Sequence, residues 1–100
     1  MQRDNTMIKV IIERKIADGL ELNYLDAARN TLRAIVSAPG YISGESLTNI
    51  NNPSHRIIIT NWTSVHAWDK WYNSAERREV IAQIAPLLEG EERISILENR

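Results

Sequence analysis

The sequence predicts an α+β fold in which a four-stranded antiparallel sheet carries helices on one of its faces. Four segments have the alternating or β-branched pattern of strands, and two longer regions have the apolar spacing of helices. Their order along the chain is strand, helix, strand, strand, helix, strand. Two strand–helix–strand units that share one sheet satisfy this order, because each crossover then joins parallel strands that are not neighbours.

The first predicted strand is "MIKVIIERK", residues 7–15. Successive side chains of a strand point to opposite faces of the sheet. Ile8, Val10 and Ile12 therefore share one face, while Ile11 lies on the other. Because both faces carry apolar side chains, we expect both to be at least partly covered.

A helix is predicted within "DGLELNYLDAARNTLRAIVSAPG", which follows this strand. We expect Asp18 to cap its N-terminus, and Pro39 and Gly40 to end it. Its apolar stripe, which we expect to face the sheet, consists of Leu20, Tyr24, Leu25, Ala28, Leu32, Ile35 and Val36.

Two strands with a turn between them are predicted in the next segment, "YISGESLTNINNPSHRIIITNW". The Asn, Pro and Ser residues of "NINNPSH" are typical of a hairpin connection. The second strand is predicted from Arg56 to Trp62. Its uninterrupted run Ile57, Ile58, Ile59 suits a central strand that is covered on both faces.

The remaining elements are two helices and a last strand. Thr63 or Ser64 is expected to cap a short helix, and Ser74 to cap the next one, which Gly90 closes. The alternating segment "ERISILE", residues 92–98, predicts the final strand. The apolar sides of the two helices are predicted to consist of Val65, Trp68 and Trp71 or Tyr72, and of Val80, Ile81, Ile84, Leu87 and Leu88.

These elements together predict a ferredoxin-like domain over residues 7–98, preceded by a tail of residues 1–6. Helices on one face leave the other face open, and this open face would carry Ile11 and part of the run Ile57–Ile59. An apolar sheet face of that size usually meets a partner or encloses a ligand. We therefore expect a homodimer that forms through the open face.

The composition excludes several classes of function. With a net charge of −1 at pH 7, the 100-residue chain shows no electrostatic footprint for nucleic acid or a membrane surface. It has no cysteine, and its two histidines stand apart from any carboxylate cluster, so neither thiol chemistry nor a metal site is expected. No apolar run approaches the roughly 20 residues that span a bilayer, and the polar start "MQRDNT" is unlike a signal peptide. We expect a cytoplasmic protein.

The segment "NWTSVHAWDKWYNSAERR" resembles the antibiotic biosynthesis monooxygenase (ABM) family. The positions Trp62, Ser64, Trp71, Ser74 and Arg77 match the family pattern after the third strand, and "APGYISGESL" resembles its entry into the second strand. The resemblance covers about residues 7–98. It implies a dimeric α+β barrel, in which two sheets pack together and each protomer encloses a pocket between sheet and helices. The activities that it implies are cofactor-independent oxygenation of polycyclic phenols and quinols, or heme degradation.

Heme degradation is not expected for this chain. That branch of the family uses an Asn on the first strand, a Trp after the third strand and an axial His about ten residues beyond. Trp71 matches the Trp, but the other two positions fall on Glu13 or Arg14 and on Ile81. Iron at such a site is held by a His. No cofactor is therefore expected.

The resemblance implies instead a cofactor-independent monooxygenase that acts on a small aromatic or quinol substrate. Such a site deprotonates, orients and stabilises its substrate. The candidate catalytic residues are Asn61, Trp71, His66 and Arg77, and the candidate pocket residues are Trp62, Tyr72, Tyr24 and Ile11.

A plainer interpretation stands beside this one. The tryptophans can equally be core residues, Asn61 can satisfy the backbone at a strand end, and His66 can lie exposed on its helix. The sequence contains no unambiguous acid, base or nucleophile at a diagnostic spacing. The alternative is therefore a dimeric module that binds a small apolar ligand, or an accessory protein, without catalysis.

Overall fold

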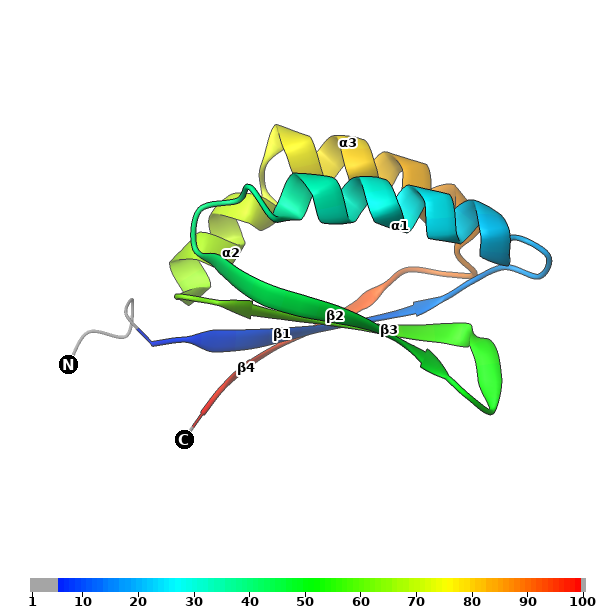
Figure 1. Ribbon diagram of the computed structural model, residues 1–100, viewed down its shortest axis with the longest axis horizontal. Coiled ribbons are helices and arrows are strands. Elements are labelled where there is room, and N and C mark those ends of the chain that lie inside the picture. Colours follow the sequence, from blue (N-terminus) through cyan, green and yellow to red (C-terminus); the bar gives the residue numbers. More distant parts are fainter. Residues whose placement is uncertain (1–5, 100) are drawn as a thin grey trace.

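The computed structural model describes residues 6–99, and the helices lie together on one side of a single sheet (Figure 1). The predicted tail lies outside the described residues except for Thr6. The elements are β1 (Ile8–Lys15), α1 (Glu21–Ile35), β2 (Tyr41–Asn49), β3 (Asn52–Trp62), α2 (Val65–Tyr72), α3 (Ala75–Ile84), the 3-10 helix η2 (Ala85–Leu87) and β4 (Arg93–Glu98).

The sheet has the strand order β2-β3-β1-β4, and all neighbouring strands are antiparallel. β3 lies between the two strands that α1 connects, and β1 lies between the two strands that α2 and α3 connect. This is the split arrangement that the element order predicted. The predicted α+β, ferredoxin-like fold is confirmed.

The two faces of β1 meet different surroundings, the helices on one side and the open face of the sheet on the other. Ile8, Val10 and Ile12 point towards the helices and are buried, and the next residue on that face is the buried Arg14. Ile11 points to the open face, where it lies opposite Ile59 of β3. The open face therefore carries apolar side chains at its centre, as predicted.

The core has two clusters rather than one. Trp62, Trp68 and Trp71 lie in the larger cluster, which also contains buried residues of β1, α1 and α3. The smaller cluster, near the turn after β1, consists of Ile16, Tyr24, Ala27 and Ile84.

An aromatic chain organises the larger cluster. The ring of Trp62 meets those of Tyr41 and Trp68 edge to face, with centroids 5.4 and 5.6 Å apart. Trp68 in turn lies 5.7 Å from Tyr72. Trp62 is fully buried, and its indole N–H donates to the Thr60 hydroxyl at 2.9 Å. Edge-to-face pairs at such separations stabilise beyond their buried area, so Trp62 and Trp68 act as packing residues.

The predicted caps of the two later helices are confirmed. The Ser64 hydroxyl accepts from the N–H of Ala67, and the Ser74 hydroxyl accepts from the N–H of Arg77, each at 3.1 Å. Each bond satisfies one of the N–H groups that a helix start leaves without an intrahelical partner. Ser64 and Ser74 therefore fix the residues at which α2 and α3 begin.

The predicted cap of α1 is wrong. Gly19, with a φ of +80°, follows Asp18 and turns the chain before the helix can begin. The cap position falls on Leu20, which has no capping side-chain bond, and the helix starts at Glu21. The turn geometry therefore displaces the helix start by two residues.

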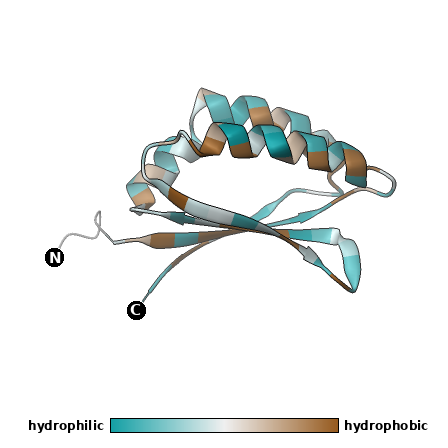
Figure 2. Ribbon diagram, in the orientation of Figure 1, coloured by the Kyte–Doolittle hydropathy of each residue, from teal (hydrophilic) through white to brown (hydrophobic). Residues whose placement is uncertain are grey.

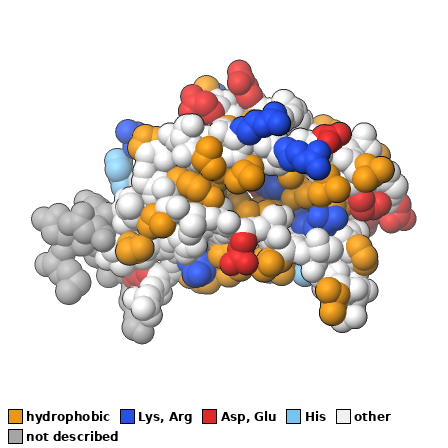
Figure 3. Space-filling view, in the orientation of Figure 1, with side chains coloured by type: hydrophobic (Ala, Val, Ile, Leu, Met, Phe, Trp, Pro, Cys, Tyr) orange, Lys and Arg blue, Asp and Glu red, His pale blue; other side chains and the backbone are white. Residues whose placement is uncertain are grey.

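The predicted apolar stripe of α1 is only partly correct. Tyr24 and Ile35 are buried, but Leu25, Leu32 and Val36 are exposed. The buried positions between them include Ala27, whose small side chain lets α1 lie close to the layer beneath it. Brown and teal turns alternate along α1 in Figure 2, and Figure 3 shows orange side chains on its outer surface.

The hairpin turn was predicted too long. β3 begins at Asn52, so only Ile50 and Asn51 separate it from β2. Pro53 and Ser54 therefore belong to the strand, and the Ser54 carbonyl accepts from the N–H of Ile16 at 2.8 Å. Among residues 6–99, no helix is long and apolar enough to cross a membrane.

Gly40 and Gly90 offer a matched test of packing at the α1–β2 connection. Both have a φ of +86°, but a Cβ on Gly40 would overlap the Ala67 side chain and lie 2.8 Å from the Thr63 hydroxyl, whereas a Cβ on Gly90 meets nothing within 4 Å. Gly90→Ala should lower the free energy of unfolding by about 1 kcal/mol, from backbone strain alone. Gly40→Ala should lower it by about 3 kcal/mol, because overpacking adds to that strain. Urea unfolding measures both, and equal losses would contradict the close contact.

Candidate functional site

A cavity of about 450 Å³ lies between α3 and the start of β4. In Figure 1 the chain leaves α3, descends beside the sheet and enters β4 at this place. We call it the α3–β4 cavity. Its wall is mostly apolar with a few polar groups, and it is lined by Tyr72, Arg77, Ile81, Ile84, Ala85, Leu88, Gly90, Glu91, Glu92 and Ile94.

A buried ion cluster forms the polar part of this wall. The carboxylate of Glu92 accepts from Nε of Arg14 at 2.8 Å through one oxygen and from Nη2 of Arg77 through the other. Arg14 is 5% exposed and Arg77 is 8% exposed. Charged groups with so little access to water remain ionised only when they are paired and hydrogen-bonded. One carboxylate thus holds two guanidinium groups in place.

Two tyrosines extend the cluster at its ends. Nη1 of Arg14 donates to the Tyr24 hydroxyl at 3.1 Å, and the guanidinium of Arg56 lies 5.6 Å from the centre of the same ring. At the other end, the guanidinium of Arg77 lies 4.6 Å from the centre of the Tyr72 ring. Cation–π contacts at these distances are attractive. The result is a continuous polar path from Tyr24 of α1, through Arg14 of β1, Glu92 just before β4 and Arg77 of α3, to Tyr72 of α2.

The environment of Glu92 shifts the pKa of its carboxyl. Burial raises this pKa, but the charge and hydrogen bond of Arg14, and then those of Arg77, outweigh burial, so that the pKa lies below its ordinary value of 4.5. Opposite charges and hydrogen bonds favour the ionised form in this way. Glu92 is therefore a fixed anion rather than a proton acceptor at neutral pH.

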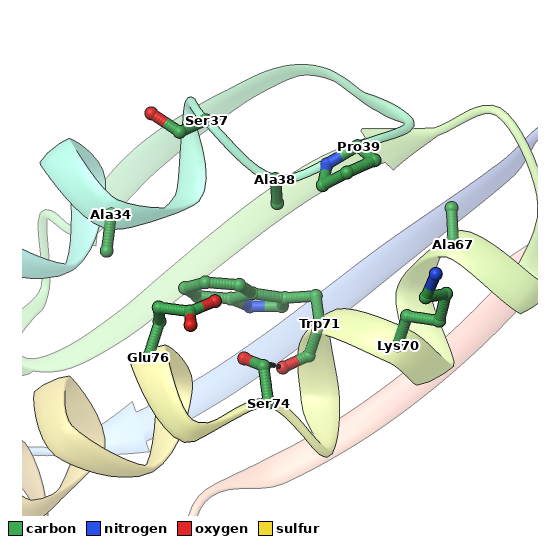
Figure 4. A pocket seen from close by; sticks show the side chains of 9 residues that line it. All are labelled: Ala34, Ser37, Ala38, Pro39, Ala67, Lys70, Trp71, Ser74 and Glu76. Atoms are coloured by element: carbon green, nitrogen blue, oxygen red, sulfur yellow. Dashed lines mark hydrogen bonds between the residues drawn. The ribbon is translucent and has the colours of Figure 1, made fainter.

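A second cavity, of about 330 Å³, lies between the C-terminal end of α1 and the helices α2 and α3 (Figure 4). We call it the α1–α2 cavity. Figure 4 shows the indole of Trp71 lying across it, between Ala38 on one side and Ser74 on the other. The Ser74 hydroxyl donates to the Trp71 carbonyl at 2.7 Å. Its lining consists of Ala34, Ser37, Ala38, Pro39, Ala67, Lys70, Trp71, Ser74 and Glu76.

The structure brings some of the predicted site residues together. Arg77 and Tyr72 both line the α3–β4 cavity, and Tyr24 is joined to the same ion cluster through Arg14. Trp71 lines the other cavity.

The remaining predicted site residues lie apart from both cavities. Asn61 and Ile11 are on the open face of the sheet, where the Asn61 amide donates to the Ser43 hydroxyl at 3.1 Å. His66 is exposed on α2, and Trp62 is fully buried in the core. The catalytic and pocket roles assigned to these residues from sequence stay predictions.

Two residues of the site were not predicted, Arg14 and Glu92. The signal for Arg14 was present in the alternation of β1, because Arg14 continues the inward face of Ile8, Val10 and Ile12. A charge on an inward face requires a buried partner. Nothing local identifies that partner, since Glu92 lies 78 residues away along the chain.

Neither cavity is built as a metal site. Among residues 6–99, no group of three His, Asp or Glu side chains is arranged to hold a metal ion. The polar groups that line the α3–β4 cavity are the Arg77 guanidinium, the Tyr72 hydroxyl and the carboxylates of Glu91 and Glu92.

Solved structures with the same architecture define the class of fold. A conserved protein from Methanosarcina mazei Go1 superimposes with a TM-score of 0.89 over 98% of this chain and 97% of that one, at 14% identity. SnoaB, a cofactor-independent oxygenase from Streptomyces nogalater, gives a TM-score of 0.86 over 95% of this chain and 94% of its own, at 12% identity. At these identities the likeness shows the fold alone.

The family follows from the sequence match. The model of the antibiotic biosynthesis monooxygenase family matches residues 7–83. The chain therefore belongs to this family, as its resemblance predicted.

Two curated relatives are also similar. Protein SchA of Streptomyces halstedii is 28% identical over 87 residues, which cover 87% of this chain. The 42.8 kDa protein in the whiE locus of Streptomyces coelicolor is 23% identical over 82 residues, which cover 82% of this chain. The matched part spans only 23% and 21% of the lengths of these two relatives.

The ion cluster predicts a defined pH dependence of stability. Because the pKa of Glu92 is lower in the folded chain, its stabilising contribution is complete above pH 4.5 and is lost as the pH falls through the folded pKa. Glu92→Gln should flatten this dependence below pH 5. At pH 7 it should lower the free energy of unfolding by about 3 kcal/mol, because two buried guanidinium groups lose their counter-charge.

Urea unfolding between pH 3 and pH 7 measures both effects. Glu91→Gln is the matched control, since Glu91 is the exposed neighbour of Glu92. If the free energy of unfolding of Glu92→Gln depends on pH as that of the wild type does, Glu92 does not cause the loss of stability in acid.

Proposed function

We propose that the protein is a cofactor-independent monooxygenase of a small aromatic or quinol substrate, and that the α3–β4 cavity is its site. The observation that carries this proposal is a cavity of about 450 Å³ in which Arg77 lies beside Glu92 and next to an apolar wall. Cavities of this size and character are typical of small-molecule sites. Membership of the ABM family supports the class of reaction.

Arg77 supplies one of the three things this reaction requires of a protein, the stabilisation of the oxyanion. An anthrone-type substrate loses a proton from its reacting carbon, and the resulting anion reacts with O₂. One oxygen atom becomes the new carbonyl oxygen, and the other leaves as water with the two hydrogens of the former CH₂ group. A guanidinium beside the developing oxyanion stabilises the transition state. Glu92 keeps the guanidinium in position.

A second candidate is a ligand-binding module without catalysis. It is favoured by the position of His66, the predicted base, which is exposed on α2 and lines neither cavity. In this candidate, the α3–β4 cavity would bind an aromatic ligand through the same contacts and would not activate it. Turnover distinguishes the two candidates.

Oxygen uptake with anthrones and naphthoquinols tests the proposed activity. We expect uptake above the spontaneous rate, and we expect Arg77→Gln to lower kcat/KM by about 10²-fold, the usual effect of removing one oxyanion donor. Arg78→Gln is the matched control, because Arg78 is the exposed neighbour whose guanidinium donates to the Asn73 carbonyl. Its kcat/KM should stay within about twofold of the wild type.

The variants also separate the two cavities. No uptake across the panel would favour the ligand-binding module. Loss of turnover in Trp71→Ala, with Arg77→Gln unaffected, would move the site to the α1–α2 cavity.

We also propose that two copies pair through the open face of the sheet. Ile11, Ile57 and Ile59 give this face an apolar centre, and polar pairs flank it. One pair is Asn61 with Ser43, and the other is His55 with Glu13, at 3.2 Å. An apolar centre with a polar rim is the usual anatomy of a protein interface.

Replacing Ile59 by Glu tests the dimer. A buried carboxylate without a partner at the centre of the interface should convert the protein to a monomer in sedimentation velocity at micromolar concentration. Leu22→Glu is the control, because Leu22 is 77% exposed on α1, away from the open face. A folded Ile59→Glu variant that remains dimeric would exclude the open face as the interface.

A further inference from the structure

The ion cluster beside the α3–β4 cavity carries an unequal number of charges. Arg14 and Arg77 contribute two positive charges, and Glu92, whose side chain is 15% exposed, contributes one negative charge. Glu91 also lines the cavity, but it is exposed, and water screens its charge. The buried groups therefore leave an excess of one positive charge.

Arg77 is the positively charged member of the cluster that lines the cavity. Arg14 contacts Glu92 without lining the cavity, whereas Arg77 lines it directly. Glu92 is thus shared between two guanidinium groups, and the three side chains together keep a net positive charge, of which Arg77 is the member at the cavity. A guanidinium has five N–H donors in a planar fork, and the hydrogen bond to Glu92 uses one of them.

The rest of the cavity suits a flat apolar body. Ile81, Ile84, Leu88 and Ile94 supply the wall, and the Tyr72 ring lies against the Arg77 guanidinium at 4.6 Å. A buried positive charge is unfavourable unless an anion compensates it, and a carboxylate matches a guanidinium through two parallel hydrogen bonds.

We propose that the α3–β4 cavity selects aromatic ligands that carry a permanent negative charge, and that an aromatic carboxylate is the class it takes. This inference rests on the proposed function in that it assigns a substrate class to the same site. The carboxylate binds Arg77, and the ring lies against the apolar wall.

Equilibrium binding of matched naphthalenes tests the inference without requiring turnover. The probes are 2-naphthoate, its neutral analogue 2-naphthamide and the cation 2-naphthylmethylammonium, titrated by calorimetry at pH 7. We expect 2-naphthoate to bind about tenfold more tightly than 2-naphthamide, as a charge-assisted pair in place of a neutral one implies. We expect the cation to bind most weakly. Equal affinities, or a preference for the cation, would overturn the proposal.

Variants of Arg77 test whether this residue causes the preference for 2-naphthoate. Arg77→Gln should abolish the difference between 2-naphthoate and 2-naphthamide, and Arg78→Gln should retain it. Arg77→Lys keeps the charge but not the planar fork, so it should keep a reduced preference even where Arg77→Gln fails to fold. A preference that survives in folded Arg77→Gln, or equal affinities in folded Arg77→Lys, would place the anion elsewhere and refute the assignment.

The two proposals fail separately. A preference for 2-naphthoate without oxygen uptake by any quinol would support the inferred ligand class and contradict the proposed monooxygenase activity. Oxygen uptake with neutral quinols, combined with equal affinities for the three probes, would support the monooxygenase activity and contradict the proposed selection for anionic ligands.

Discussion

The Arg14–Glu92–Arg77 cluster is the interaction on which the site and much of the fold depend. It joins the end of β1, the first turns of α3 and the segment that enters β4, which are far apart in the sequence. Removing one member of such a buried set leaves uncompensated charge, which typically costs 3–5 kcal/mol. The ion cluster adjoins the smaller apolar cluster of the core, because Arg14 donates to the hydroxyl of Tyr24, a member of that apolar cluster. The α3–β4 cavity borders the ion cluster, since Arg77 and Glu92 both line that cavity.

Local signals made much of the fold predictable. Ser64 and Ser74 each bond an N–H three residues ahead, so the sequence alone was enough to place two helix starts. The alternation in β1 placed Ile11 on the open face correctly. The predictions for α1 failed, because its start and its buried face depend on a turn and on tertiary packing rather than on the local apolar pattern. Gly19 moved the start of α1, and close packing at Ala27 put Leu32 on the outside, although a leucine is on average the more buried residue.

The site was less predictable than the fold, for a physical reason. Aromatic crowding between Asn61 and Arg78 suggested one site, but a strand end, two short helices and the turn between them point the side chains in different directions. All three tryptophans pack in the core, where Trp71 also lines one cavity, whereas Arg77 lines the other. Arg77 acquires its position from Glu92, 15 residues further along the chain. A pattern within one segment cannot contain the contact that positions its most important side chain.

The period of two in β1 ties the site to the proposed interface. Ile8, Val10, Ile12 and Arg14 share the helix side, and Ile11 shares the open side with β3 residues of the same character. A register shift of one residue would turn Arg14 to the open face and Ile11 towards the helices. The first change would strip Glu92 of one partner, and the second would remove an apolar side chain from the centre of the open face. Both faces therefore constrain the same register. Any substitution that makes β1 slip should damage the cavity and the apolar centre of the open face together, whereas substitutions within α1 or α3 can reach only the helix side.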